Sequence, residues 1–133
     1  MVTSNEVRAR IDAAVEESWA EELAWLQKLV RFESVTGHEA GCQSWLASDF
    51  AARGWEVDSF AIRDVDLDAY DVAVPMARGA SADMMQVVAR VPSVAPQTGR
   101  SLIMQGHVDV VPPGPAEFWT DAPFSGVIRD DRL

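Results

Sequence analysis

The sequence predicts an α/β domain in which helices pack on a mixed β-sheet. Signals for helix starts, each followed by apolar residues, occur along the first part of the chain. An amphipathic segment then ends at Gly54, and alternating apolar and polar residues follow it at once. Two further runs, 85–91 and 101–105, are rich in Val, Ile, Leu and Met and end at Pro or Gly. The order of helix, glycine and strand is typical of α/β proteins.

A Ser or Thr followed three residues later by Glu predicts a helix N-terminus, because the two side chains cap each other's backbone amides. This pattern occurs at Thr3/Glu6, Ser18/Glu21 and Thr36/Glu39. After the first signal, apolar residues recur every four positions from Val7 to Leu23, a spacing that drifts around a straight helix. Two helices that meet near Ser18, or one bent helix, both satisfy this pattern.

The third signal predicts a helix with Trp45, Leu46 and Phe50 facing inward and Gly54 just beyond its end. Strands are expected at 55–62, at 85–91 and at 101–105, with a short further one near 127–128. The run 101–105 is the most continuously apolar, so we expect it to be the most buried. About three or four strands are therefore expected.

The segment 63–83 holds acidic residues, Pro and Gly, which indicates a solvated surface loop. Asp64, Asp66 and Asp68 alternate as in a calcium-binding loop. An EF-hand needs Gly where Ala69 stands and Glu where Pro75 stands, so that interpretation fails.

Composition excludes several classes of protein. The 133 residues carry 11 basic and 21 acidic side chains, a net charge of −10, which disfavours binding to nucleic acid or to an anionic membrane. One cysteine, Cys42, excludes an internal disulfide framework. We find no apolar run of about 20 residues and no secretory leader, so a cytoplasmic location is expected.

The chemically informative residues follow the run 101–105. Residues two apart in extended chain point to the same side, so the Asp109 carboxylate is expected beside the His107 ring. A carboxylate that accepts from one ring nitrogen leaves the other nitrogen's lone pair for a metal ion. By itself, a His-x-Asp pair is more often an exposed or mutually satisfied polar pair than a metal site.

The block 106–112 (Gly-His-Val-Asp-Val-Val-Pro), with Phe-Trp at 118–119, Pro-Phe at 123–124 and Ile-Arg-Asp at 128–130, resembles a known family. It is similar to the two-zinc amidohydrolases, which include acetylornithine deacetylase, succinyl-diaminopimelate desuccinylase, aminoacylase and glutamate carboxypeptidase. The upstream block 29–39 (Leu-Val-Arg-Phe-Glu-Ser-Val-Thr-Gly-His-Glu) resembles the end of the family's first helix and the following turn. The deacetylase and desuccinylase branch looks most similar.

The resemblance implies a metal-dependent hydrolase that cleaves the amide bond of N-acyl amino acids or related amides. It implies His107 as a ligand of one of two zinc ions, with cobalt or manganese as alternatives, and Asp109 as the catalytic residue that orients it. The substrate-binding residues stay unknown. Residues 1–133 would form the N-terminal part of a zinc-peptidase-like catalytic domain, without the dimerising lid domain, so a homodimer of the complete protein is left open.

The family's bridging aspartate and its glutamate base belong to motifs that we do not find in this sequence. We therefore expect the 133-residue chain alone to be inactive. The alternative hypothesis is a non-catalytic α/β module that binds a partner. Among other residues, His38 is interpreted as exposed and structural, Cys42 as a small buried residue, and Thr36 as a helix cap. Trp119 is expected to pack with Phe118 and Phe124 beneath the metal loop rather than to contact substrate.

Overall fold

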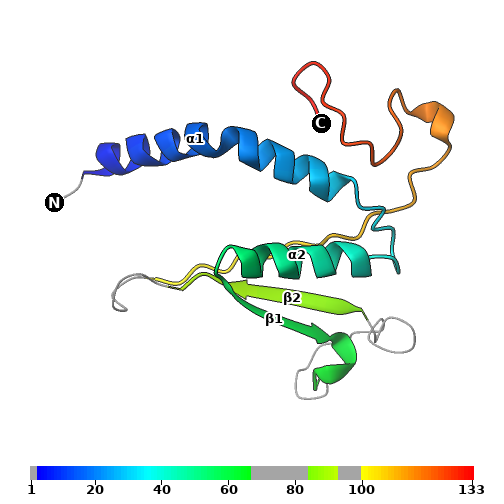
Figure 1. Cartoon of the computed structure of the whole chain (residues 1–133), viewed down its shortest axis with the longest axis horizontal. Helices are drawn as coiled ribbons and strands as arrows, with labels where there is room; N and C mark the ends of the chain where they lie inside the picture. Colours follow the sequence, from blue (N-terminus) through cyan, green and yellow to red (C-terminus); the bar gives the residue numbers. More distant parts are fainter. Residues whose placement is uncertain (1–2, 67–83, 93–99) are drawn as a thin grey trace. The chain divides into compact units, whose positions relative to one another are not determined.

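A computed structural model describes residues 3–66, 84–92 and 100–133 (Figure 1). The chain forms two compact units. One consists of Met1–Phe32 together with Pro113–Leu133, and the other is Glu33–Pro112. The described helices and strands belong to an α/β protein, as predicted. None of the helices in these ranges combines the length and the apolar content needed to cross a membrane.

Helix α1, Ser4–Val30, begins at the first predicted signal. Thr3 Oγ1 accepts from the Glu6 amide at 3.3 Å, and the Thr3 amide donates to Glu6 Oε2 at 2.7 Å. The second signal is not a cap, because Ser18 lies inside a continuous helix (Figure 1). Its hydroxyl donates to the Ala14 carbonyl at 2.9 Å instead, a bond that often bends helices. Of the two predicted alternatives, the single helix is therefore confirmed.

The first unit is held together by polar contacts between α1 and the C-terminal segment. Gln27 Nε2 donates to the Gly126 carbonyl at 2.7 Å, and Arg31 Nε donates to the Ser125 carbonyl at 3.2 Å. Gly126 has φ +61°, and a Cβ there would lie 2.8 Å from the Gln27 carbonyl oxygen. A side chain at this position would separate the segment from the helix. No residue of α1 is buried.

Helix α2, Ala40–Ala52, ends as the sequence predicts. Gly54 has φ +78°, its amide donates to the Ala51 carbonyl, and the Trp55 amide donates to the Phe50 carbonyl. These two bonds form a Schellman motif. The rings of Phe50 and Trp55 stack with centroids 5.0 Å apart, which adds the apolar contact that commonly accompanies the motif. The helix end and the strand that follows are thus fixed together.

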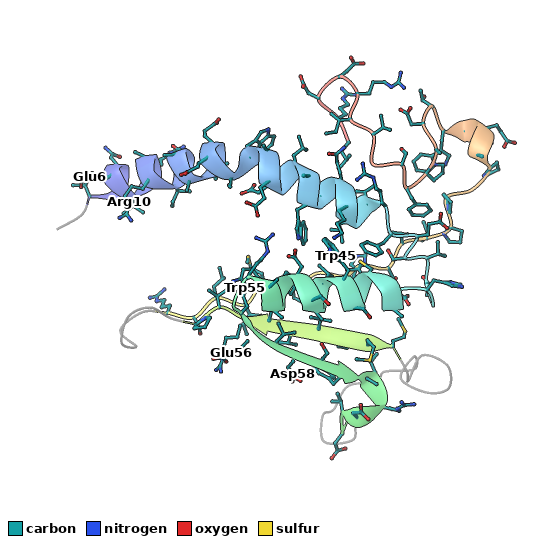
Figure 2. The ribbon with its side chains drawn as sticks, in the orientation of Figure 1. Glu6, Arg10, Trp45, Trp55, Glu56 and Asp58 are labelled. Carbon is teal, nitrogen blue, oxygen red and sulfur yellow. The ribbon has the colours of Figure 1, made fainter. Side chains whose placement is uncertain are left out.

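Strands β1, Glu56–Ala61, and β2, Met85–Arg90, pair antiparallel, with Glu56 opposite Arg90 and Ala61 opposite Met85. Helix α2 packs against both strands. Glu56 and Asp58 are exposed and project away from α2 (Figure 2), and the Arg90 side chain pairs with Glu56. A short 3-10 turn, Ile62–Asp64, follows β1, and another, Ala116–Phe118, lies in the C-terminal segment. Among the residues that the structure describes, the buried apolar ones are Cys42, Leu46 and Ala61.

The predicted strand 101–105 is wrong. Leu102, Ile103 and Met104 are 82%, 89% and 87% exposed, and the run belongs to no sheet in the described part of the chain. An apolar run can be buried in a sheet only when neighbouring strands complete its hydrogen-bond ladder, and sequence pattern alone does not supply those neighbours. Residues 127–128 likewise form no strand.

The predicted mixed sheet of three or four strands is therefore corrected to one antiparallel pair among the described residues. The third helix signal is corrected as well. Glu39 is the N-cap residue of α2, and its carboxylate accepts from the Gly37 amide at 2.7 Å. Because α2 begins at Ala40 and has no side-chain cap hydrogen bond, Thr36 is not the cap. Most of the predicted acidic loop, residues 67–83, lies outside the described residues.

We expect Gly54→Ala to lower the free energy of unfolding by about 1 kcal/mol, because an L side chain is strained at positive φ. Gly106→Ala is the matched control. A Cβ at Gly106 meets nothing within 4 Å and its φ lies outside the strained range, so its effect should stay within about 0.5 kcal/mol. Urea unfolding followed by tryptophan fluorescence measures both. Equal effects of the two substitutions would contradict the role of Gly54.

The start of α1 should respond to acid. Hydrogen bonds from the Thr3 amide and hydroxyl lower the pKa of Glu6 below its ordinary value of 4.5. A lowered folded-state pKa means that the stabilisation is complete above the unfolded value and is lost as pH falls through the folded value. We expect the Cα chemical shifts of the first helical turn to move toward coil values in that acidic range. Glu6→Gln should remove this acid response, because its amide side chain does not titrate in that range, and an unchanged response in that variant would refute the capping explanation.

Candidate functional site

The candidate site lies on a short extended segment that the second unit holds by its backbone. The Val110 amide donates to the Ser34 carbonyl at 3.0 Å, and the Thr36 amide donates to the Val110 carbonyl at 3.2 Å. These bonds make an isolated parallel bridge between Val35 and Val110. In addition, Ser34 Oγ donates to the Val108 carbonyl at 2.6 Å. The segment 108–110 is thus attached to the chain just after the first helix.

His107 and Asp109 lie beside each other, as their spacing predicts. His107 Nδ1 is 3.0 Å from Asp109 Oδ1 and 3.1 Å from the Asp109 carbonyl oxygen. Both partners are acceptors, so Nδ1 must be the nitrogen that carries the proton. In the neutral ring, Nε2 then carries the lone pair. Because the His107 side chain is 81% exposed, that lone pair is accessible to a ligand from solvent.

This arrangement fits one metal ligand with its orienting carboxylate. A metal-binding histidine normally donates its other N–H to a carboxylate or a carbonyl, and His107 faces one of each. A catalytic zinc ion needs about three protein ligands. Within residues 3–66, 84–92 and 100–133, no three His, Cys, Asp or Glu side chains group closely enough to hold an ion. The described residues therefore do not by themselves complete a three-ligand site.

Two other sequence candidates are structural. His38 is exposed, and its backbone amide donates to the Val35 carbonyl at 2.7 Å, which closes the turn before α2. Cys42 is 1% exposed, and burial raises the pKa of its thiol. Because the thiolate is the nucleophilic form, a raised pKa opposes a catalytic role. Both residues are thus as the sequence analysis expected.

The aromatic residues after the site differ from the expectation. Trp119 Nε1 donates to the Pro113 carbonyl at 2.9 Å, so its indole is tied to its own segment. Phe118 is 80% exposed, and the predicted packing of this side chain is wrong. Nearby, Arg129 pairs with Asp121 at 2.8 Å. These local bonds add to the hydrogen bonds that Gln27 and Arg31 of α1 donate to the same segment.

Sequence reasoning missed the part that Ser34 plays. The residue lies within the block 29–39, whose resemblance to the family concerns the end of the first helix and the following turn. Its side chain is buried and its partner, Val108, lies 74 positions away along the chain. The local sequence, Phe-Glu-Ser-Val-Thr, carries no pattern that marks this serine as buried or that identifies so distant a partner.

Comparison with known proteins identifies the relatives of the chain. It is 35% identical over 111 residues to a succinyl-diaminopimelate desuccinylase of Methylorubrum extorquens, which covers 84% of this chain and 24% of that protein. The succinyl-diaminopimelate desuccinylase of Thioalkalivibrio sulfidiphilus is 34% identical over 107 residues, which cover 80% of this chain and 22% of that protein. That of Xanthomonas oryzae is 35% identical over 105 residues, which cover 79% of this chain and 22% of that protein. The chain thus spans about a quarter of the length of these relatives. No family model matches it.

The single thiol offers a direct test of the buried interpretation of Cys42. We expect Cys42 to react with Ellman's reagent about tenfold or more slowly in the native chain than in urea, since burial both shields the thiol and raises its pKa. The rate of absorbance change measures this, and no second cysteine contributes to it. A native rate equal to the unfolded rate would show that the thiol is accessible.

Proposed function

Because the chain is a relative of the succinyl-diaminopimelate desuccinylases, we propose that this protein is a metal-dependent hydrolase that cleaves the amide bond of N-acyl amino acids. One observation supports the proposal beyond the similarity. The His107 ring has its Nδ1 proton directed at acceptors and its Nε2 open to solvent, which is the state that a metal ligand requires. Residues 1–133 would then contribute to a catalytic domain.

Zinc is the ion we propose for this site, with cobalt or manganese as alternatives, because imidazole binds all three. Such an ion lowers the pKa of a bound water and polarises an amide carbonyl. The chain's own contribution is to hold the ligand. The Asp109 carboxylate accepts a hydrogen bond from the Nδ1–H of His107, which keeps the Nε2 lone pair available and makes the imidazole a stronger electron-pair donor to a metal. His107 is therefore proposed as the metal ligand and Asp109 as the residue that orients it.

The substrate class follows from the names of the relatives and is also a proposal. Those proteins are named for the removal of a succinyl group from diaminopimelate. Acetylated amino acids such as N-acetylornithine are the second substrate type that the sequence resemblance implies. In both substrate types, an amide bond joins the acyl group to an amino group of the amino acid, which also carries a carboxylate.

One observation favours a different function. Val7, Ile11, Val15 and Trp19 follow one another at four-residue spacing on α1, and each is 43% to 58% exposed. Exposed apolar residues on one side of a helix are a common feature of binding surfaces for partner proteins. A non-catalytic partner-binding module would use this surface and would not need His107.

Substitution of His107 separates these functions. In the complete encoded protein, we expect about two bound zinc ions and release of succinate or acetate from the two substrate types. His107→Ala should remove about one ion and lower kcat/KM by about a thousandfold or more, since the metal stabilises developing charge. Metal content by mass spectrometry and product release measure the two effects.

His38→Ala is the matched control, because the His38 side chain is exposed and the hydrogen bond to the Val35 carbonyl comes from the backbone amide, which alanine keeps. We expect this variant to retain both metal and activity. Full zinc content and turnover in His107→Ala would reject the hydrolase proposal at this site. Loss of both properties in His38→Ala would show that the effect is not specific to His107.

A further inference from the structure

Ser34 is the buried polar residue beside the candidate site. It is 5% exposed, and its Oγ donates to the Val108 carbonyl at 2.6 Å. Val108 is the residue between His107 and Asp109. The hydroxyl therefore binds the backbone between the two functional residues, and this hydrogen bond involves neither of their side chains.

Ser34 holds the peptide groups on both sides of Asp109. The Val108 carbonyl belongs to the peptide group that precedes Asp109, and the Ser34 hydroxyl binds it. The Val110 amide belongs to the peptide group that follows Asp109, and the Ser34 carbonyl accepts from it at 3.0 Å. Two fixed peptide planes leave the φ and ψ angles of the residue between them little freedom. The direction of the Asp109 side chain is thereby restricted.

Of these two bonds, only one depends on the identity of the side chain. Any residue at position 34 can accept through its backbone carbonyl, and the same holds for the bond from the Thr36 amide to Val110. The bond to Val108 needs a hydroxyl. Without it, the peptide group before Asp109 can rotate, and the carboxylate can leave the His107 ring.

We propose that Ser34 is a positioning residue that fixes Asp109 and, through it, the tautomer of His107. The proposal deepens the proposed function, on which it rests, because the tautomer matters to a metal that binds Nε2. It assigns to the Ser34 hydroxyl a part in the chemistry of the site, beyond its contribution to the stability of the bridge.

The matched pair Ser34→Thr and Ser34→Val tests this assignment, because the two side chains have almost the same shape and differ by one hydroxyl. The measurement is the ¹⁵N chemical shift pattern of the His107 ring in the metal-free chain, at about pH 8, where an ordinary histidine is neutral. His38→Ala identifies the His107 signals. Wild type and Ser34→Thr should show the Nδ1–H form. Ser34→Val should lower the ratio of Nδ1–H to Nε2–H about tenfold, which is the factor expected for one hydrogen bond to a charged acceptor.

An unchanged tautomer ratio in Ser34→Val would overturn the proposal. Ser34→Ala is the second variant if the valine side chain does not fit, and it should show the same tenfold fall. Loss of amide chemical-shift dispersion in both variants would also overturn the proposal, because the hydroxyl would then be a requirement of the fold. Titration of the wild-type chain with zinc chloride tests the underlying function separately. If the ratio falls as expected while zinc leaves the His107 signals unmoved, the positioning role stands and the metal role fails.

Discussion

The attachment of residues 108–110 to residues 34–36 is the constraint on which the candidate site depends. Two backbone hydrogen bonds and one serine hydroxyl join parts of the chain that are more than 70 positions apart. An extended segment has no hydrogen bonds within itself, so its conformation is fixed only when another part of the chain binds its backbone. Ser34 and Val110 give this segment its partners. As a result, His107 and Asp109 belong to a segment whose backbone is fixed by hydrogen bonds, although the side chain of His107 is 81% exposed and that of Asp109 is 42% exposed.

The second unit combines this attachment with a small core. Cys42 and Leu46 of α2 are buried with Ala61 at the end of β1, and the Schellman turn at Gly54 fixes how the helix leads into the strand. Among the described residues of this unit, Leu102, Ile103 and Met104 are exposed. The C-cap of α2, the turn at Gly54 and the ladder between β1 and β2 add to the organisation of the unit.

The chemistry of the site follows from the two oxygen atoms of Asp109 that accept hydrogen bonds from His107 Nδ1. A histidine whose Nδ1 faces a carboxylate and a carbonyl has one tautomer available when neutral, so its free nitrogen is a ligand or a base and not a donor. Under the proposed function this state has a role, because a metal-binding histidine normally donates its other N–H to a carboxylate or a carbonyl. The thiol of Cys42 and the imidazole of His38 lack these surroundings, and burial or exposure accounts for them without any catalytic role.

The sequence by itself determined the features that depend on near neighbours. The capping box of Thr3 and Glu6, the glycine turn after α2, the two strands that pair and the contact between His107 and Asp109 each involve residues close together in the chain or a simple alternation. Tertiary structure decided the rest. The apolar run 101–105 is exposed because burial depends on which strands lie beside it, and Ser18 became a helix-interior residue because the helix continued through it. Ser34 acquired its role only when folding brought Val108 within 2.6 Å, since a hydrogen bond between distant residues leaves no periodic pattern in the sequence.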